Sequence, residues 1–153
     1  MGEVDTRLVR SNNPVRSEHV VWGRLVPAGA LALVLATAAN ALVYLVASSL
    51  GAMPQDVDAN GQGPITLPMV VAMSAVGAVV GTLVYAVVGR FARRPVRVFR
   101  LVSALALVLS FVGPFTIPGA PAAMVGALLL MHTIAAVTVV GLLTTLAAKA
   151  YGD

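Results

Sequence analysis

Cysteine is absent from this chain of 153 residues. Without thiols the protein has no disulfides, no cysteine nucleophile and no thiolate metal ligand. Charge is scarce as well: Lys, Arg, Asp and Glu together make up 10% of the residues, whereas a soluble domain carries about 25%. Hydrophobic residues reach 59%. The composition therefore excludes thiol chemistry and favours a membrane protein.

Four long apolar stretches dominate the sequence. They occupy residues 25–50, 65–88, 98–112 and 122–146. About 20 apolar residues in a helix are enough to cross a bilayer, and we predict an all-α fold, a polytopic membrane four-helix bundle over residues 24–148. Carboxylates are absent from all four stretches. This argues against an ion-coupled pump, which usually needs a carboxylate that loses and regains a proton.

The distribution of positive charge predicts the orientation of the bundle. The basic residues are Arg7, Arg10, Arg16, Arg24, Arg90, Arg93, Arg94, Arg97, Arg100 and Lys149. The connections 51–64 and 113–121 contain no Lys or Arg. Short basic segments stay in the cytoplasm, so both termini are expected inside (N-in/C-in), with the protein as a multi-pass component of the cytoplasmic (inner) membrane.

The polar ends of the chain are expected to be cytoplasmic. Residues 1–23 are predicted to be a retained tail, disordered over Met1–Asn13, and residues 149–153 a cytoplasmic C-terminus. The segment Ser17–Arg24, with Trp22 at headgroup level, is expected to form a short interfacial helix.

The basic residues also predict the partners of the protein. Beside membrane segments, arginines meet anionic lipid headgroups, worth about 1 kcal/mol for each residue near the surface. We therefore expect headgroup contacts, and no nucleic-acid binding, for the basic strip between the second and third stretches. Its members are Arg90, Arg93, Arg94, Arg97 and Arg100. A homo-oligomer or a membrane protein partner is also expected.

Two polar residues inside the apolar stretches are candidates for a site. Asn40 in the first stretch and His132 in the fourth are expected at similar depth, in the outer half of the bilayer. Asn40 shares a helix face with Tyr44, which extends the polar set. One interpretation is a hydrogen bond between Asn40 and His132 that fixes helix register, worth about 0.6 kcal/mol. The other is an intramembrane binding site, since ionisable groups there are functional candidates.

Small residues and methionines supply two weaker signals. Gly77 and Gly81 form a GxxxG pair, which allows close approach of helices within the chain or between subunits. Apart from Met1, every methionine falls in the expected outer half or outer loop, at positions 53, 69, 73, 124 and 131. Thioethers with an imidazole suit Cu(I), but methionine also fills gaps in apolar cores. We predict no metal and no cofactor.

Catalytic patterns are missing from the predicted spans. His19 falls in the polar tail, so the spans hold a single histidine rather than the pair that a transmembrane haem needs. No acidic residue is present in them to complete a Ser-His-Asp arrangement. No nucleotide-binding glycine pattern is expected, because no strands are predicted. We therefore predict that the protein is not an enzyme.

Several short patterns resemble a known family of small four-helix prokaryotic membrane proteins, a domain of unknown function. The resemblance rests on Ala39-Asn40, Tyr44-Leu45, Gly51, Gly77, Gly81, Tyr85, the Arg-rich segment Phe91–Arg100, Ser110, Pro114 and Met131-His132. It covers about Val20 to Leu146. The resemblance implies an integral membrane protein with Asn40 and His132 as family-type positions, and it brings no activity with it.

Two functions are consistent with the sequence. The first is a non-enzymatic packing or partner-binding membrane component, in which Asn40 and His132 lock the bundle. The alternative is a small transporter or channel-like component with a polar pocket around Asn40, Tyr44 and His132. A water-accessible cavity at that depth would favour the alternative.

Overall fold

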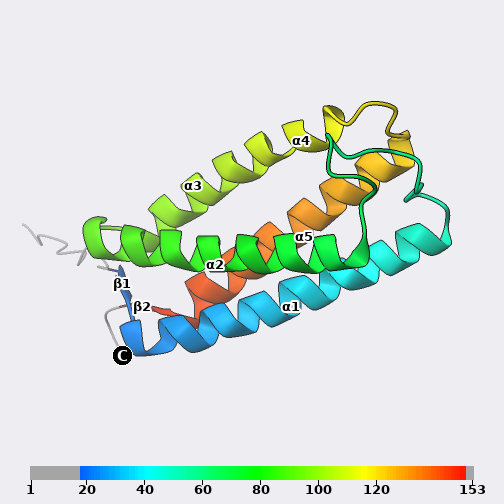
Figure 1. Ribbon diagram of the computed structural model, residues 1–153. Helices are drawn as coiled ribbons and strands as arrows, with labels where there is room; N and C mark the ends of the chain where they lie inside the picture. The colour runs from blue at the N-terminus through cyan, green and yellow to red at the C-terminus, as the bar shows by residue number, and fades with distance from the viewer. Residues whose placement is uncertain (1–17, 151–153) are drawn as a thin grey trace, which may run out of the picture.

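The computed structural model describes residues 18–150 and confirms an all-α fold with four long helices (Figure 1). All four are long and apolar enough to span a membrane, the third being the stretch Pro95–Phe115 that comprises α3 and α4. In chain order the elements are β1 (Glu18–Val20), α1 (Trp22–Ser49), α2 (Leu67–Phe91), α3 (Pro95–Ser110), α4 (Val112–Phe115), α5 (Ala122–Leu146) and β2 (Ala148–Ala150). The expected disordered start of the tail and the arginines at positions 7, 10 and 16 lie outside the described residues.

Prolines mark three of the helix starts. Pro68 and Pro95 lie in the first two positions of α2 and α3, and Pro121 is the N-cap of α5. Proline is tolerated there because the missing N–H has no partner within the helix anyway. This explains why α3 begins three residues before the apolar stretch expected at residues 98–112. The helix accommodates Arg97 and Arg100 because long side chains carry their charge outward on apolar stems.

The structure differs from the sequence prediction at the start of α1. Over Glu18–Val20 the chain is a short strand and not part of an interfacial helix. This strand pairs antiparallel with β2, so that His19 lies opposite Lys149. Val21 N donates to Ala147 O at 2.9 Å and continues the ladder. The pairing joins segments about 130 residues apart in the chain, which no local sequence pattern reveals.

The bundle has two distinct ends. We call them the strand end, with β1, β2 and the α2–α3 turn, and the loop end, with residues 50–66 and 116–121. Helix α1 packs along both α5 and α2, while α3 contacts α2 and α5 less extensively. The buried residues of α3 are Pro95, Val96 and Phe99, all near the strand end. Figure 1 shows α3 diverging from α2 toward α4.

Two apolar cores fill the bundle, one towards each end. The core at the strand end contains the fully buried Tyr85 and Phe99, whose ring centroids lie 4.7 Å apart at 51°. The core at the loop end is built around Tyr44, Met124 and Met131. Along α1 and α2, the buried polar residues of the bundle interior fall between the two cores.

Glycines allow the helices to approach closely at specific points. A Cβ atom on Gly81 would lie 2.8 Å from Val139 Cγ1 of α5, and one on Gly29 would lie 2.7 Å from Thr82 Cγ2 of α2. Gly77 differs, because a Cβ atom there would meet nothing within 4 Å. Of the predicted GxxxG pair, Gly81 therefore contributes to helix packing within the chain, whereas Gly77 does not.

Candidate functional site

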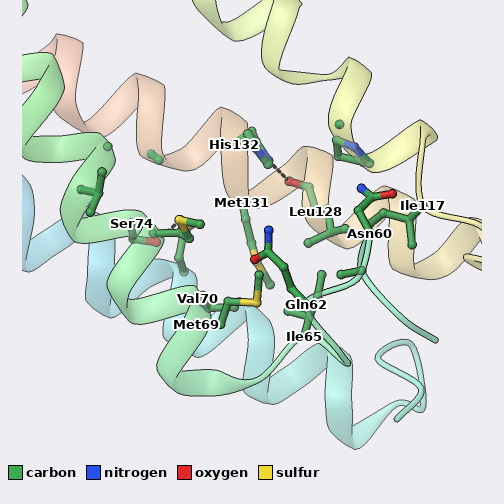
Figure 2. A pocket seen from close by; sticks show the side chains of 18 of the residues that line it. Asn60, Gln62, Ile65, Met69, Val70, Ser74, Ile117, Leu128, Met131 and His132 are labelled. Carbon is green, nitrogen blue, oxygen red and sulfur yellow. Dashed lines mark hydrogen bonds between the residues drawn. The ribbon is translucent and has the colours of Figure 1, made fainter. Parts of the chain in front are cut away.

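A pocket of about 570 Å³ lies at the loop-end half of the bundle. Its walls come from α1, α2, α4, α5 and the loop between α1 and α2 (Figure 2). The lining residues are Asn40, Ala59, Asn60, Gln62, Ile65, Met69, Val70, Met73, Ser74, Val76, Gly77, Val80, Gly113, Pro114, Ile117, Leu128, Met131, His132 and Ala135. Because α3 packs on its neighbours mainly at the strand end, the pocket forms where the helices diverge.

Asn40 contributes a buried amide to this pocket. Its side chain is 4% exposed, and its Nδ2 donates to Ser74 Oγ at 2.9 Å, which joins α1 to α2. The Oδ1 atom of the same amide is buried without a hydrogen-bond partner. A buried polar atom without a partner costs about 1–3 kcal/mol. Asn40 is therefore half satisfied by the protein itself, and its Oδ1 atom is buried beside the pocket without a partner.

His132 lines the pocket from α5 and is half-buried. Its Nδ1 atom lies 2.7 Å from Leu128 O, one turn earlier on the same helix (Figure 2). A carbonyl oxygen accepts hydrogen bonds only, so Nδ1 carries the proton of this contact. In the neutral imidazole, Nε2 then has a free lone pair. His132 is therefore a second acceptor at the pocket.

The structure does not join Asn40 to His132 directly. The first bonds to Ser74 and the second to its own helix, so the expected hydrogen bond between them is replaced by two others. Tyr44, the third candidate, does not line the pocket. Its hydroxyl donates to Ile65 O at 3.1 Å and holds the segment before α2 against α1. Asn40 and His132 thus line the same pocket but hydrogen-bond to different partners.

The loop between α1 and α2 covers the pocket, and Asp58 organises that loop. Its Oδ1 accepts from Gly61 N at 3.1 Å and from Gly63 N at 2.7 Å. These bonds hold the intervening turn, in which Asn60 has a positive φ of 57°. Asn60 and Gln62 thereby reach the pocket (Figure 2). The sequence analysis missed both, because a loop side chain is placed by the turn that carries it.

Three methionines add sulfur to the pocket wall. Met69 and Met73 come from α2 and Met131 from α5. Among the described residues, no group of three or more His, Cys, Asp or Glu could hold a metal ion. Flexible thioethers instead adapt to a bound apolar group. The wall is therefore mostly apolar, with a few polar atoms at defined positions.

The expected headgroup-binding arginines gather at the strand end. Arg90 lies in the last turn of α2, Arg93 and Arg94 lie in the connection to α3, and Arg97 and Arg100 lie in the first turns of α3. All five are exposed. Between residues 19 and 148 the acidic side chains are Asp56 and Asp58, both in the loop at the opposite end. The bundle is thus electrically polar along its length.

The fold and pocket define a class: an all-α protein with four helices of membrane-spanning length around a mostly apolar pocket. The chain belongs to a family of unknown function (DUF6069), whose sequence profile matches residues 20–149. This confirms the resemblance expected from its short motifs. No curated protein and no solved structure matches the chain.

Proposed function

We propose that this protein is a non-enzymatic, multi-pass component of the cytoplasmic membrane that binds a small amphiphilic molecule in the pocket. The proposal joins the membrane role expected from the sequence to the polar pocket of the alternative interpretation. The observation that carries it is the pocket itself, whose mostly apolar walls include His132 and the half-satisfied amide of Asn40.

The size and chemistry of the pocket support a ligand of drug-like dimensions. Ligand sites typically measure about 300–1,000 Å³, with apolar walls and a few placed polar groups. The pocket has about 570 Å³ and fits this description. Nε2 of His132 favours a ligand with a hydrogen-bond donor, and the unpartnered Oδ1 of Asn40 would accept a second one once neighbouring side chains shift to uncover it. A molecule with a hydroxyl or amide N–H on an apolar body would satisfy both.

Binding is better supported than a channel. The strand-end core contains Tyr85, Phe99 and Leu143, each at most 1% exposed. Tight packing of these side chains fills that half of the bundle. A continuous path would require this core to open. The pocket is therefore interpreted as a binding site reached from the loop end or from the side.

Helix packing alone explains less of the structure. The Asn40–Ser74 hydrogen bond does link two helices, as a structural role requires. A residue that served packing alone would gain from satisfying its second amide atom as well. His132 makes its described bond within its own helix and so does not cross-link the bundle through it.

Native mass spectrometry from nanodiscs tests this function. The three proteins to compare are the wild type, Gly77→Leu and Gly126→Leu. A leucine at Gly77 would project into the pocket, whereas Gly126 is exposed outside it, and a Cβ at either glycine would meet nothing within 4 Å. We expect a discrete bound mass in the wild type and Gly126→Leu that is lost in Gly77→Leu.

Three outcomes would overturn the proposal. One is a wild-type protein that carries ordinary phospholipid alone. Another is a bound mass that survives in Gly77→Leu. The third is a bound mass equal to one copper ion, which would instead assign Met69, Met73, Met131 and His132 to a metal site.

A further inference from the structure

A second hollow, separate from the pocket, runs between α3 and α5. It has a volume of about 320 Å³. Its lining residues are Arg100, Ser103, Ala104, Leu107, Ala136, Val137, Val140, Gly141 and Thr144. None of these residues lines the first pocket. We call this hollow the α3–α5 groove.

The α3 side of the groove is a single helix face. Arg100, Ser103, Ala104 and Leu107 follow the spacing i, i+3, i+4 and i+7, which places them in one stripe. Arg97 lies three residues before Arg100 and continues the stripe toward the strand end. The face therefore carries positive charge at one end and small or apolar side chains along the rest.

Arg100 is held at the charged end of the groove. Its Nη2 donates to Thr144 Oγ1 of α5 at 3.3 Å, and Thr144 Oγ1 in turn donates to Val140 O at 2.8 Å. A guanidinium has five N–H donors, so most of the donors of Arg100 remain for another acceptor. The side chain is exposed. It lies about 8 Å along α3 from the helix start, by helical rise.

The remainder of the groove is mostly apolar, and both of its walls include small residues. Ser103 and Ala104 face it from α3, and Ala136 and Gly141 face it from α5. A Cβ atom on Gly141 would meet nothing within 4 Å, so the glycine leaves open space there. Such a trough offers an apolar surface to a hydrocarbon chain beside the guanidinium.

We propose that the α3–α5 groove binds a phospholipid with an anionic headgroup. The phosphate accepts hydrogen bonds from Arg100, Arg97 adds positive charge, and one acyl chain lies along Ala104 and Gly141. Charge complementarity supports this occupant, because the acidic side chains between residues 19 and 148 both lie at the opposite end of the bundle. In other membrane proteins, basic sites between transmembrane helices bind anionic lipid headgroups.

The test is lipid retention by the full chain in nanodiscs of phosphatidylglycerol and phosphatidylcholine. Native mass spectrometry counts the phosphatidylglycerol that remains on each released protein. Arg100→Gln removes the charge, and Gly141→Leu fills the groove without altering charge. The matched controls are Arg93→Gln, an exposed arginine outside the groove, and Gly126→Leu, an exposed glycine outside it.

We expect bound phosphatidylglycerol to fall by more than about fivefold in Arg100→Gln, because a general headgroup contact of one surface arginine is worth about 1 kcal/mol and Arg100 also donates hydrogen bonds in the groove. Gly141→Leu should reduce it at least as much. Gly126→Leu should retain the wild-type level, and Arg93→Gln should lose at most the roughly fivefold of a general headgroup contact. Equal losses in Arg93→Gln and Arg100→Gln would overturn the proposal in favour of diffuse attraction. Full retention in Gly141→Leu would overturn it as well.

A separate measurement guards against misfolded variants. Circular dichroism should show wild-type helicity and thermal melting for Gly141→Leu. Ala104→Leu is a second variant that fills the groove, from the opposite wall. Loss of lipid in both, with helicity intact, supports the groove. Retention in Ala104→Leu with intact helicity would contradict it. Gly77→Leu should leave phosphatidylglycerol binding unchanged, which keeps this result independent of the pocket proposed above.

Discussion

Asn40 on α1 donates a hydrogen bond from Nδ2 to Ser74 Oγ on α2 across 2.9 Å, in the region between the two apolar cores. Both side chains are buried, at 4% and 7% exposure. On α1 the nearest core residues on either side are Ala36 and Tyr44. The bond is thus a polar link inside an otherwise apolar helix interface, and it borders the pocket.

A double-mutant cycle of Asn40→Ala and Ser74→Ala should reveal this link. We expect a coupling of about 0.6 kcal/mol, and at most about 1.7, as for other interhelical bonds in membrane proteins. The measurement is the free energy of unfolding in mixed micelles by denaturant titration. The matched control is the cycle of Asn40→Ala with His132→Ala. It should be additive, because the two residues bond to different partners. Coupling in the control cycle alone would restore the direct pair expected from the sequence.

Alanine should have opposite effects at two glycines. A Cβ on Gly29 would lie 2.7 Å from Thr82 Cγ2, and Thr82 is held by its own bond to Ala78 O at 2.8 Å. Overpacking costs about 1–3 kcal/mol, more than the gain of about 1 kcal/mol in helix propensity. Gly29→Ala should therefore lower the melting temperature.

Gly77→Ala should raise the melting temperature slightly, since its Cβ meets open space. The double variant Gly29→Ala with Thr82→Ala should recover much of the lost stability, because the clashing atoms are removed. Equal effects at both glycines would show that helix propensity alone determines the change in melting temperature. They would contradict the close packing of α1 against α2 at Gly29.

The tautomer of His132 can be read directly. The contact of Nδ1 with Leu128 O at 2.7 Å requires the proton on Nδ1 in the neutral ring. Solid-state NMR of ¹⁵N-histidine protein in lipid should give a protonated Nδ1 and an unprotonated Nε2. His19 is the other histidine of the chain, so His19→Gln isolates the signal. A proton on Nε2 would remove the second acceptor of the pocket.

The orientation in the membrane is testable because the chain has no cysteine. Single cysteines at Asp56 and Phe91, both exposed and at opposite ends of the bundle, report each side. A membrane-impermeant maleimide should label Asp56→Cys in intact cells. It should label Phe91→Cys only after the cells are lysed. The opposite pattern would reverse the predicted N-in/C-in topology and with it the cytoplasmic headgroup contacts.

Most of the helices could be predicted from local patterns in the sequence. Apolar stretches of sufficient length predicted four helices, and α5 has the predicted bounds of residues 122–146. The predicted start of α3 was three residues too late, because Arg97 interrupts the apolar stretch whereas Pro95 begins the helix. The strands β1 and β2 were missed, since each gains its hydrogen bonds from a segment at the far end of the chain.

Some residues of the candidate site could be predicted from the sequence. Depth along two helices predicted that Asn40 and His132 would lie near one another, and both line one pocket. Their partners could not be predicted, because Ser74 meets Asn40 through the rotation of α2 about its axis. The same rotation points Gly81 at α5 and leaves Gly77 at the pocket. Periodicity gives the residues that share a face, but not which face meets which neighbour.

By itself, the sequence determined the class of the protein and the number and approximate extent of its membrane-length helices. The physical reason is that transfer of apolar residues into lipid is local and additive along the chain. The tertiary structure decided where the helices diverge, and hence that the pocket and the α3–α5 groove exist. These hollows depend on contacts such as Tyr85 with Phe99, which hold α3 close at one end and leave it apart at the other.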